Sequence, residues 1–224
     1  MDIRALIFDM DGTIVDSMPS HTQSWLELAH RHGLEIDIAD LMRRTTGRTG
    51  LECVRILFGR DMSDAEATVY VHEKEAAYRE IFAPKFAEVQ GFTAFAEHAR
   101  QRGLKIGVGT AGDRHNWAFA YANLNMHHQP LATVGGDEGL PGKPEPAIFL
   151  EVARRLDVEP SQCIVFEDAP LGIEAARRAG MHAVGICTGH SAADLAGPHV
   201  LAHAAHYNEL MNQQFLERHH AVQL

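Results

Sequence analysis

Two pairs of acidic residues occupy equivalent places in the sequence. Asp9 and Asp11 come directly after one short apolar run, and Glu167 and Asp168 come directly after another. Carboxylates held this close repel one another, and a cation between them relieves the repulsion. Taken singly, an Asp-x-Asp or a Glu-Asp pair is typical of a solvated turn or a helix N-cap. Two such pairs, both at the ends of strand-like runs, favour a site for a hard divalent cation such as Mg²⁺.

Two further residues follow the same pattern. Thr110 ends the strand-like run 104–109, and Lys143 lies in a short loop between a glycine and a proline. The chain has a formal net charge of −10, from 20 Lys and Arg against 30 Asp and Glu, and has no basic run. Such a surface repels nucleic acid, so no nucleic-acid partner is expected. An anionic substrate would need a locally positive site, which a metal ion and Lys143 could supply.

Strand-like and helical patterns alternate along most of the chain. Short apolar runs predict strands at 5–8, 104–109, 131–134, 162–166 and 182–186. Apolar residues at helical spacing predict helices at 92–102, 114–124, 145–156 and 170–179, and a terminal helix from Tyr207 to Leu224. Between Met18 and Phe82 there is no good strand candidate, and helices are expected at 20–32, 37–45, 49–58 and 63–82.

This order predicts a doubly wound, parallel-sheet α/β core with a Rossmann-like arrangement of strands. The core would comprise residues 1–16 plus 86–224, and residues 17–85 would form a small all-helical cap inserted after the first strand. Open parallel sheets place their ligands at the carboxyl ends of the strands. The acidic pairs, Thr110 and Lys143 would then converge on one site.

These stretches resemble the four motifs of the haloacid dehalogenase superfamily of phosphatases and mutases, in order and with suitable spacing. The motifs are DMDGT (9–13), Thr110, Lys143 and FEDAPLGIEAARRAGM (166–181). The predicted insert is similar to the superfamily's small α-helical cap. The stretch DSMPSHTQSW (16–25), together with Arg48, resembles the β-phosphoglucomutase and sugar-phosphate phosphatase branch. The stretch after Thr110 departs from the serine-rich sequence of the mutase.

The resemblance implies a phosphoryl-transfer role for three core residues. Asp9 would attack phosphorus and form an aspartyl-phosphate. Asp11 would protonate the leaving oxygen and later deprotonate the attacking water, while its backbone carbonyl binds the metal. Lys143 would neutralise negative charge on Asp9 and on the phosphoryl oxygens. An acid at position 11 argues against the dehalogenase members, which lack one there.

The remaining core residues would hold the metal and the phosphoryl group. Asp168 is implied as a further Mg²⁺ ligand, beside Asp9 and Asp11, with Glu167 holding a metal-bound water. Thr110 would bind the transferring phosphoryl together with the neighbouring N–H groups of Ala111 and Gly112.

Four residues of the insert are implied as substrate contacts. In relatives, the counterparts of His21, Trp25 and Lys74 face the substrate when the cap closes, and Arg48 could bind a distal anionic group. Three of the four have a structural alternative, since Trp25 at helical spacing suits an apolar core, and Lys74 and Arg48 suit a solvated surface. Arg48 also aligns poorly with the arginine-bearing loop of the mutase.

The predicted function is therefore a Mg²⁺-dependent phosphomonoester hydrolase acting on a small phosphorylated metabolite, such as a sugar phosphate. A β-phosphoglucomutase-type mutase is the alternative with the same core residues. A non-catalytic, phosphate-accepting receiver domain would be about half this length and uncapped. A capped fold that binds without turnover is a further alternative, but none of the core residues named above is missing to support it. The stretch 107–112 also spells GxGxxG, the dinucleotide-binding fingerprint, but it lies mid-chain and leaves the acidic pairs unexplained.

Other features of the sequence predict the cellular location and the partners of the protein. Three cysteines without CxxC spacing indicate small buried residues in a reducing compartment. The adjacent pairs His127-His128 and His219-His220 lack metal-ligand spacing and suit a solvated surface. No apolar run approaches the roughly 20 residues of a membrane span, and the chain begins without a signal-like segment. A cytoplasmic protein without a membrane partner is expected, as a monomer or weak dimer.

Overall fold

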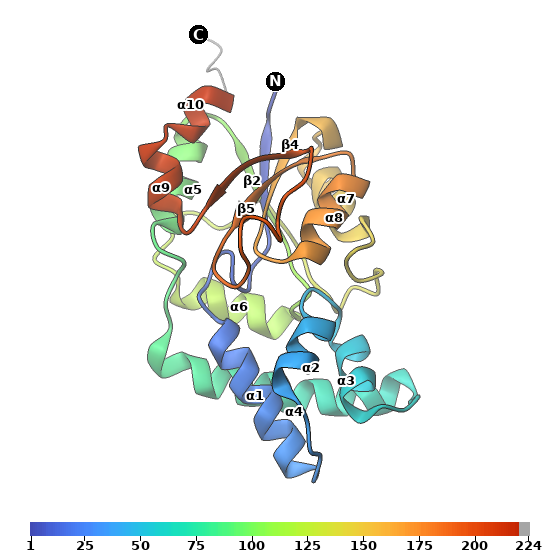
Figure 1. Cartoon of the computed structure of the whole chain (residues 1–224). Helices are drawn as coiled ribbons and strands as arrows, with labels where there is room; N and C mark the ends of the chain where they lie inside the picture. Colours follow the sequence, from blue (N-terminus) through green and yellow to red (C-terminus); the bar gives the residue numbers. More distant parts are fainter. Residues whose placement is uncertain (220–224) are drawn as a thin grey trace.

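The computed structural model describes residues 1–219 and contains a six-stranded parallel sheet (Figure 1). The strands are β1 (Ala5–Phe8), β2 (Lys105–Gly109), β3 (Ala132–Val134), β4 (Cys163–Glu167), β5 (His182–Ile186) and β6 (Val200–Ala204). Their order is β3-β2-β1-β4-β5-β6, and every pair is parallel. All four residues of β1 are buried, as an apolar central strand covered on both faces requires.

Helices cover both faces of the sheet and bury an apolar cluster on each side (Figure 1). One face is covered by α5 (Phe92–Gln101), α6 (Arg114–Asn123), α9 (Tyr207–Asn212) and α10 (Phe215–His219). The other face is covered by α7 (Ala147–Leu156) and α8 (Pro170–Arg178). Short 3-10 turns lie at Ala83–Lys85 and Pro160–Gln162. The α/β fold predicted from the sequence is confirmed.

Four helices lie together beyond the sheet, at the lower end of Figure 1. They are α1 (Met18–Arg31), α2 (Ile38–Thr45), α3 (Gly50–Phe58) and α4 (Asp64–Phe82), and we call residues 18–82 the helical unit. It buries its own apolar cluster around Trp25 and Val54. Two of its helices, α3 and α4, begin at good caps, since Thr49 forms a capping box with Glu52 and Ser63 accepts the Glu66 N–H. No helix in residues 1–219 is long and apolar enough to cross a membrane.

Two features near the end of the described chain differ from the sequence prediction. Strand β6 was not predicted, because four of its five residues are only partly buried and the apolar signal is weak. The single terminal helix predicted from Tyr207 is wrong: α9 ends at Asn212, and α10 starts at Phe215. The break falls at Gln214, whose φ of 53° is left-handed. The last five predicted helical residues lie outside the described part.

Two of the three glycines of the GxGxxG stretch are explained by packing. Gly107 and Gly109 lie inside β2, not in a loop that could cradle a phosphate. A Cβ on Gly107 would lie 2.4 Å from the Val152 side chain, and one on Gly109 would lie 3.0 Å from the Phe149 ring. These glycines therefore let α7 approach the sheet closely, and the dinucleotide-binding interpretation loses its basis.

Candidate active site

A cavity of about 100 Å³ lies between the carboxyl ends of the strands and the helical unit. The strand order reverses between β2, β1 and β4, which is the place where open parallel sheets bind ligands. Every candidate residue named from the sequence lines this cavity: Asp9, Asp11, His21, Trp25, Arg48, Lys74, Thr110, Ala111, Gly112, Lys143, Glu167 and Asp168. Met18, Met42, Thr45, Thr46, Gly47, Gly50, Cys53, Glu75 and Ala169 also line it and were not singled out.

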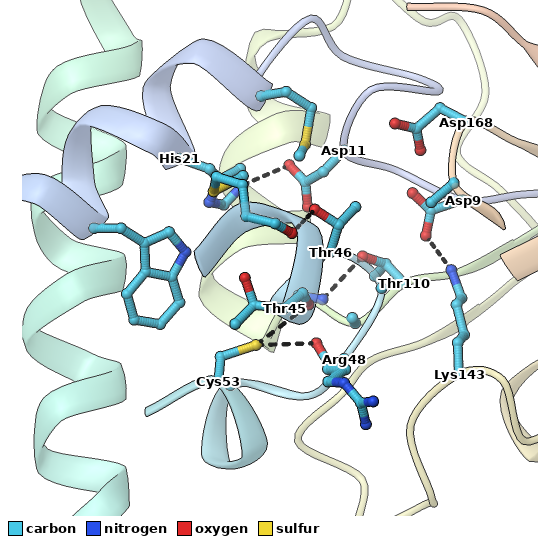
Figure 2. Close-up of a pocket in the computed structure, with 18 of the residues that line it drawn as sticks. Asp9, Asp11, His21, Thr45, Thr46, Arg48, Cys53, Thr110, Lys143 and Asp168 are labelled. Carbon is cyan, nitrogen blue, oxygen red and sulfur yellow. Dashed lines mark hydrogen bonds and ion pairs between the residues drawn. The ribbon is translucent and has the colours of Figure 1, made fainter. Parts of the chain in front are cut away.

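The core side of the cavity consists of Asp9, Lys143, Glu167 and Asp168. Lys143 Nζ lies 2.5 Å from Asp9 Oδ1 (Figure 2). It also lies 2.5 Å from Glu167 Oε1. All four side chains are buried, which strengthens their electrostatic interactions. Burial lowers the pKa of Lys143, but the two carboxylates raise it more, so the lysine remains a cation.

The negative charge on the core side exceeds what one lysine can balance. Burial raises the pKa of Asp9 to about 7, with Glu167 and Asp11 adding to the effect and Lys143 opposing it. Burial, followed by the charges of Glu167 and Asp9, also raises the pKa of Asp168 well above its usual range. Thr13 Oγ1 donates a long hydrogen bond of 3.5 Å to the Asp168 carboxylate. This arrangement fits an added cation.

The donor set also limits what that cation would be. Within residues 1–219, no three His, Cys, Asp or Glu side chains are placed to hold a metal by themselves. Asp9 and Asp168 offer hard carboxylate oxygens, so a cation here would complete its shell with backbone oxygen and water. Mg²⁺ keeps several waters when protein-bound, and the residues fit it on this ground.

Close backbone packing brings the two acidic loops together. Gly12 has φ of 80°, and a Cβ there would lie 2.3 Å from Asp168 Oδ2. A Cβ on Gly172, in α8, would lie 1.8 Å from Glu167 Oε1. A larger residue at either position would displace a carboxylate. The glycines are therefore needed for the spacing of the acids.

The loop after β5 ties the same two acidic loops to each other. Thr188 Oγ1 donates a 2.6 Å hydrogen bond to the carbonyl of Gly12, after the first acidic pair. His190 Nδ1 lies 2.9 Å from the carbonyl of Asp168, in the second. One short loop thus fixes the backbones that carry Asp9, Asp11 and Asp168.

Asp11 forms a hydrogen-bonded chain into the helical unit. His21 Nε2 lies 2.9 Å from Asp11 Oδ1, and Ser17 donates to the same oxygen at 2.6 Å. Lys74 Nζ lies 2.5 Å from His21 Nδ1. A lysine ammonium can only donate, so Nδ1 accepts, and Nε2 carries the hydrogen that is donated to Asp11. Burial alone raises the pKa of Asp11, but His21 and Ser17 lower it to about 2, so Asp11 is a carboxylate in this state.

The helical side of the cavity consists of His21, Trp25, Lys74 and Glu75. Lys74 is 2% exposed, lies 4.9 Å from the centre of the Trp25 ring and pairs with Glu75 at 2.9 Å. Tyr78 stacks on His21, with ring centres 3.8 Å apart. Trp25 belongs to the apolar cluster of the helical unit and also lines the cavity, so its packing role is confirmed and its substrate contact stays a prediction. The expectation of a solvated Lys74 is wrong.

The loop after β2 supplies polar groups to the cavity. Thr110 is buried, and its Oγ1 accepts the Gly112 N–H at 3.0 Å. The hydroxyl hydrogen of Thr110 can therefore be donated to an anion, whereas the Gly112 N–H already has a partner. Ala111 and Gly112 line the cavity beside it. A phosphoryl contact through these residues stays a prediction.

Two predicted contacts have other partners in this structure. Arg48 donates from Nε to the Arg44 carbonyl at 2.9 Å and lies 3.5 Å from Glu52. Its guanidinium is directed away from the acids in Figure 2. Both oxygens of Glu167 are engaged, one by Lys143 and one by the Ala169 N–H at 2.9 Å. Glu167 therefore orients the lysine here, and its predicted contact with a metal-bound water is untested.

The paired histidines and the three cysteines are also described by the structure. His127 and His128 are exposed, as expected. His219 is partly buried and packs against the Phe215 ring, so it is not a solvated residue, and His220 lies outside the described residues. Cys53 and Cys163 are buried and free, and Cys187 is partly buried. Cys53 lines the cavity and donates to the Thr45 carbonyl at 3.4 Å. Burial raises its pKa to about 12, so this thiol is not a nucleophile.

The chain is similar to known proteins in sequence and in fold. A family model described as haloacid dehalogenase-like hydrolase matches residues 3–180. The chain belongs to the haloacid dehalogenase-like hydrolases. Members of this family generally use Mg²⁺. The family predicted from the four motifs is confirmed.

Individual relatives of this haloacid dehalogenase-like hydrolase cover nearly its whole length. It is 33% identical to validoxylamine A 7'-phosphate phosphatase of Streptomyces hygroscopicus over 88% of this chain and 92% of that protein. It is 34% identical to fructose-1-phosphate phosphatase YqaB of Escherichia coli over 81% of this chain and 95% of that protein. The crystal structure of β-phosphoglucomutase from Clostridium difficile aligns with a TM-score of 0.83, at 26% identity and 97% coverage of both chains.

Proposed function

We propose that this hydrolase is a Mg²⁺-dependent phosphomonoesterase of small sugar phosphates, acting through an aspartyl-phosphate on Asp9. The observation that carries the proposal is the buried contact of Asp9 with Lys143 at the end of the central strand, opposite the Asp11–His21 pair. The names of two relatives, both phosphatases of phosphorylated sugars or sugar-like compounds, support the substrate class.

In the first step, an Asp9 oxygen would attack phosphorus, and the bond from phosphorus to the substrate oxygen would break. Lys143 donates a hydrogen bond to the second Asp9 oxygen and would stabilise negative charge on the phosphoryl group. Asp11 would deliver a proton to the leaving oxygen. It is ionised in the resting state, so it must first take up a proton, which the negative charge of the incoming phosphate would favour.

In the second step, water would attack phosphorus and release inorganic phosphate from Asp9. Asp11 is then the base that takes the water proton. The His21 hydrogen bond holds its carboxylate in place, and Ser17 supports the same oxygen. One residue would thus serve as acid and then as base.

A divalent cation would be held by Asp9, Asp168 and the backbone carbonyl of Asp11. When bound, it would neutralise the charge shared by the acidic residues and the phosphate. Glu167 would act beside it by holding Lys143 against Asp9. The cation would also offset the excess negative charge of the core side, where three carboxylates face only Lys143.

We also propose that residues 17–85 act as a cap domain. A cavity of about 100 Å³ is well below the roughly 300–1,000 Å³ of pockets that enclose a drug-sized ligand. A sugar phosphate would therefore enter when the helical unit moves away from the sheet. Return of the helical unit would exclude bulk water from the site.

The test is a screen of sugar phosphates and p-nitrophenyl phosphate, with Mg²⁺ and with EDTA. Release of inorganic phosphate with Mg²⁺, its loss in EDTA and its recovery on adding Mg²⁺ are expected. Activity unchanged by the chelator would contradict the metal assignment. Isomerised sugar phosphate without free phosphate would identify a mutase, the alternative suggested by similarity to β-phosphoglucomutase.

A further inference from the structure

Among the residues that line the cavity, three are Lys or Arg: Lys143, Lys74 and Arg48. Lys143 belongs to the core side and is placed for the phosphate that reacts. A substrate with a second phosphate at its far end would need a cation on the helical side. Only Lys74 and Arg48 among these lining residues could provide it.

Lys74 is already neutralised. Its ammonium carries three hydrogens, and two of them are used by Glu75 Oε1 at 2.9 Å and His21 Nδ1 at 2.5 Å. Both charged side chains are almost fully buried. Burial alone would raise the pKa of Glu75, but the charge of Lys74 and the hydrogen bond from Asn116 hold it below its usual value, so the carboxylate stays charged. The buried pair is therefore close to neutral as seen from the cavity.

Glu75 cannot easily move away to free the lysine. Its Oε2 accepts a 2.6 Å hydrogen bond from Asn116 Nδ2, and Asn116 Oδ1 accepts a 2.7 Å bond from Arg79. Glu75 and Arg79 belong to α4 of the helical unit, and Asn116 belongs to α6 of the core. The carboxylate that neutralises Lys74 is thus held from both parts of the molecule.

Arg48 does not provide a free cation for a second phosphate either. Its guanidinium is held by the Arg44 carbonyl and faces Glu52 on the same helical unit. About a third of the side chain is exposed, and Figure 2 shows it directed away from the acids. A second phosphate would have to draw it out of these contacts and compete with Glu52.

We infer that the Lys74–Glu75 pair makes this site select monophosphates whose far end is an uncharged polyol, and exclude sugar bisphosphates. The inference rests on the proposed function and narrows its substrate class. It also bears on the fate of the aspartyl-phosphate. Transfer of that group to a hydroxyl of a sugar monophosphate would form a bisphosphate, with one phosphate facing Glu75. Transfer to water forms only inorganic phosphate.

The experiment compares a ketohexose 1-phosphate with its 1,6-bisphosphate, by kcat/KM for phosphate release in Mg²⁺. The wild type should prefer the monophosphate by about tenfold or more, because the second phosphate would lose water without finding a free cation to pair with. Glu75→Gln keeps the shape and removes the charge. This variant should reduce the preference for the monophosphate, mainly by lowering KM for the bisphosphate. Glu80→Gln, the same charge change at an exposed position of α4, should leave the preference unchanged.

Each result separates this inference from the proposed function. No phosphate release from either sugar or from p-nitrophenyl phosphate would contradict the proposed function itself. Equal kcat/KM for the two sugars in the wild type would overturn only the inference, as would an unchanged preference in folded Glu75→Gln. Melting temperature reports whether that variant folds. If the variant does not fold, the inference is tested on the wild type alone, by the ratio of kcat/KM for the two sugars and by the inhibition constant of the bisphosphate. Tight inhibition by the bisphosphate would overturn the inference.

Discussion

The two sides of the cavity differ in how their charges balance. The core side carries three carboxylates, Asp9, Glu167 and Asp168, against the single cation Lys143. On the helical side, Lys74 is matched by Glu75. An excess of buried negative charge suits a site that takes up a metal cation, whereas a balanced pair suits the orientation of neutral groups. On this basis we propose that the core side determines the reaction and the helical side determines which substrate is accepted.

The largest effect is expected from the core side. Asp9→Asn should reduce turnover by roughly 10⁴-fold or more, as loss of a nucleophile typically does. The measurement is p-nitrophenyl phosphate hydrolysis in Mg²⁺, with melting temperature as the check that the variant folds. The change is nearly isosteric, and Lys143 keeps its contact with Glu167. A folded variant with near wild-type turnover would rule out the nucleophile assignment.

Asp11 lies between the two sides and should have the next largest effect. Asp11→Asn should cost roughly two to four orders of magnitude in kcat, the usual contribution of a general acid or base. The loss should be greater for a sugar phosphate than for p-nitrophenyl phosphate, because p-nitrophenolate leaves without a proton. An equal loss on both substrates would place Asp11 outside proton transfer to the leaving group.

A smaller effect is expected from His21. His21→Ala removes the hydrogen bond to Asp11 and the acceptor for Lys74, but touches no residue of the core side. It should change the ranking of sugar phosphates more than p-nitrophenyl phosphate turnover. Steady-state kinetics on a panel of substrates measures this. If the ranking is retained while all rates fall together, His21 acts only on the chemistry.

The smallest effect on activity is expected from matched core truncations. Leu28 lies in the apolar cluster of the helical unit, and Leu156 lies in a cluster under the sheet. Leu→Ala at either buried position should cost about 2–5 kcal/mol of unfolding free energy. Denaturant unfolding measures that loss. Only Leu28→Ala should raise KM for a sugar phosphate. A similar change in KM for Leu156→Ala would remove the distinction between the two sides.

The core side was predictable from the sequence for a physical reason. Asp9, Thr110 and Asp168 each follow a strand of a parallel sheet, and the carboxyl ends of parallel strands meet at one edge. Strand prediction therefore places these residues together even though they are far apart in the chain. Helices and strands were found within about two residues, except at the end of the chain.

The helical side was harder to predict. Glu75 follows Lys74 directly, and adjacent residues on a helix usually face different directions. Its pairing depends on Asn116, which comes from another element and carries no spacing signal. Thr45, Thr46 and Cys53 line the cavity because α2 and α3 turn back toward the sheet, and that turn is set by packing between helices. The sequence named Lys74 but not the carboxylate that neutralises it.

The loop after β5 bears on which divalent cation the proposed metal site would prefer. Thr188 and His190 hold the carbonyls of Gly12 and Asp168, so this loop acts as a spacer between the two acidic turns. Divalent ions differ in radius, and a carboxylate pair that suits a small ion is too narrow for a larger one. Substitutions in this spacer could widen or narrow the gap without altering any ligand, and the ionic radius that the protein prefers would shift with it.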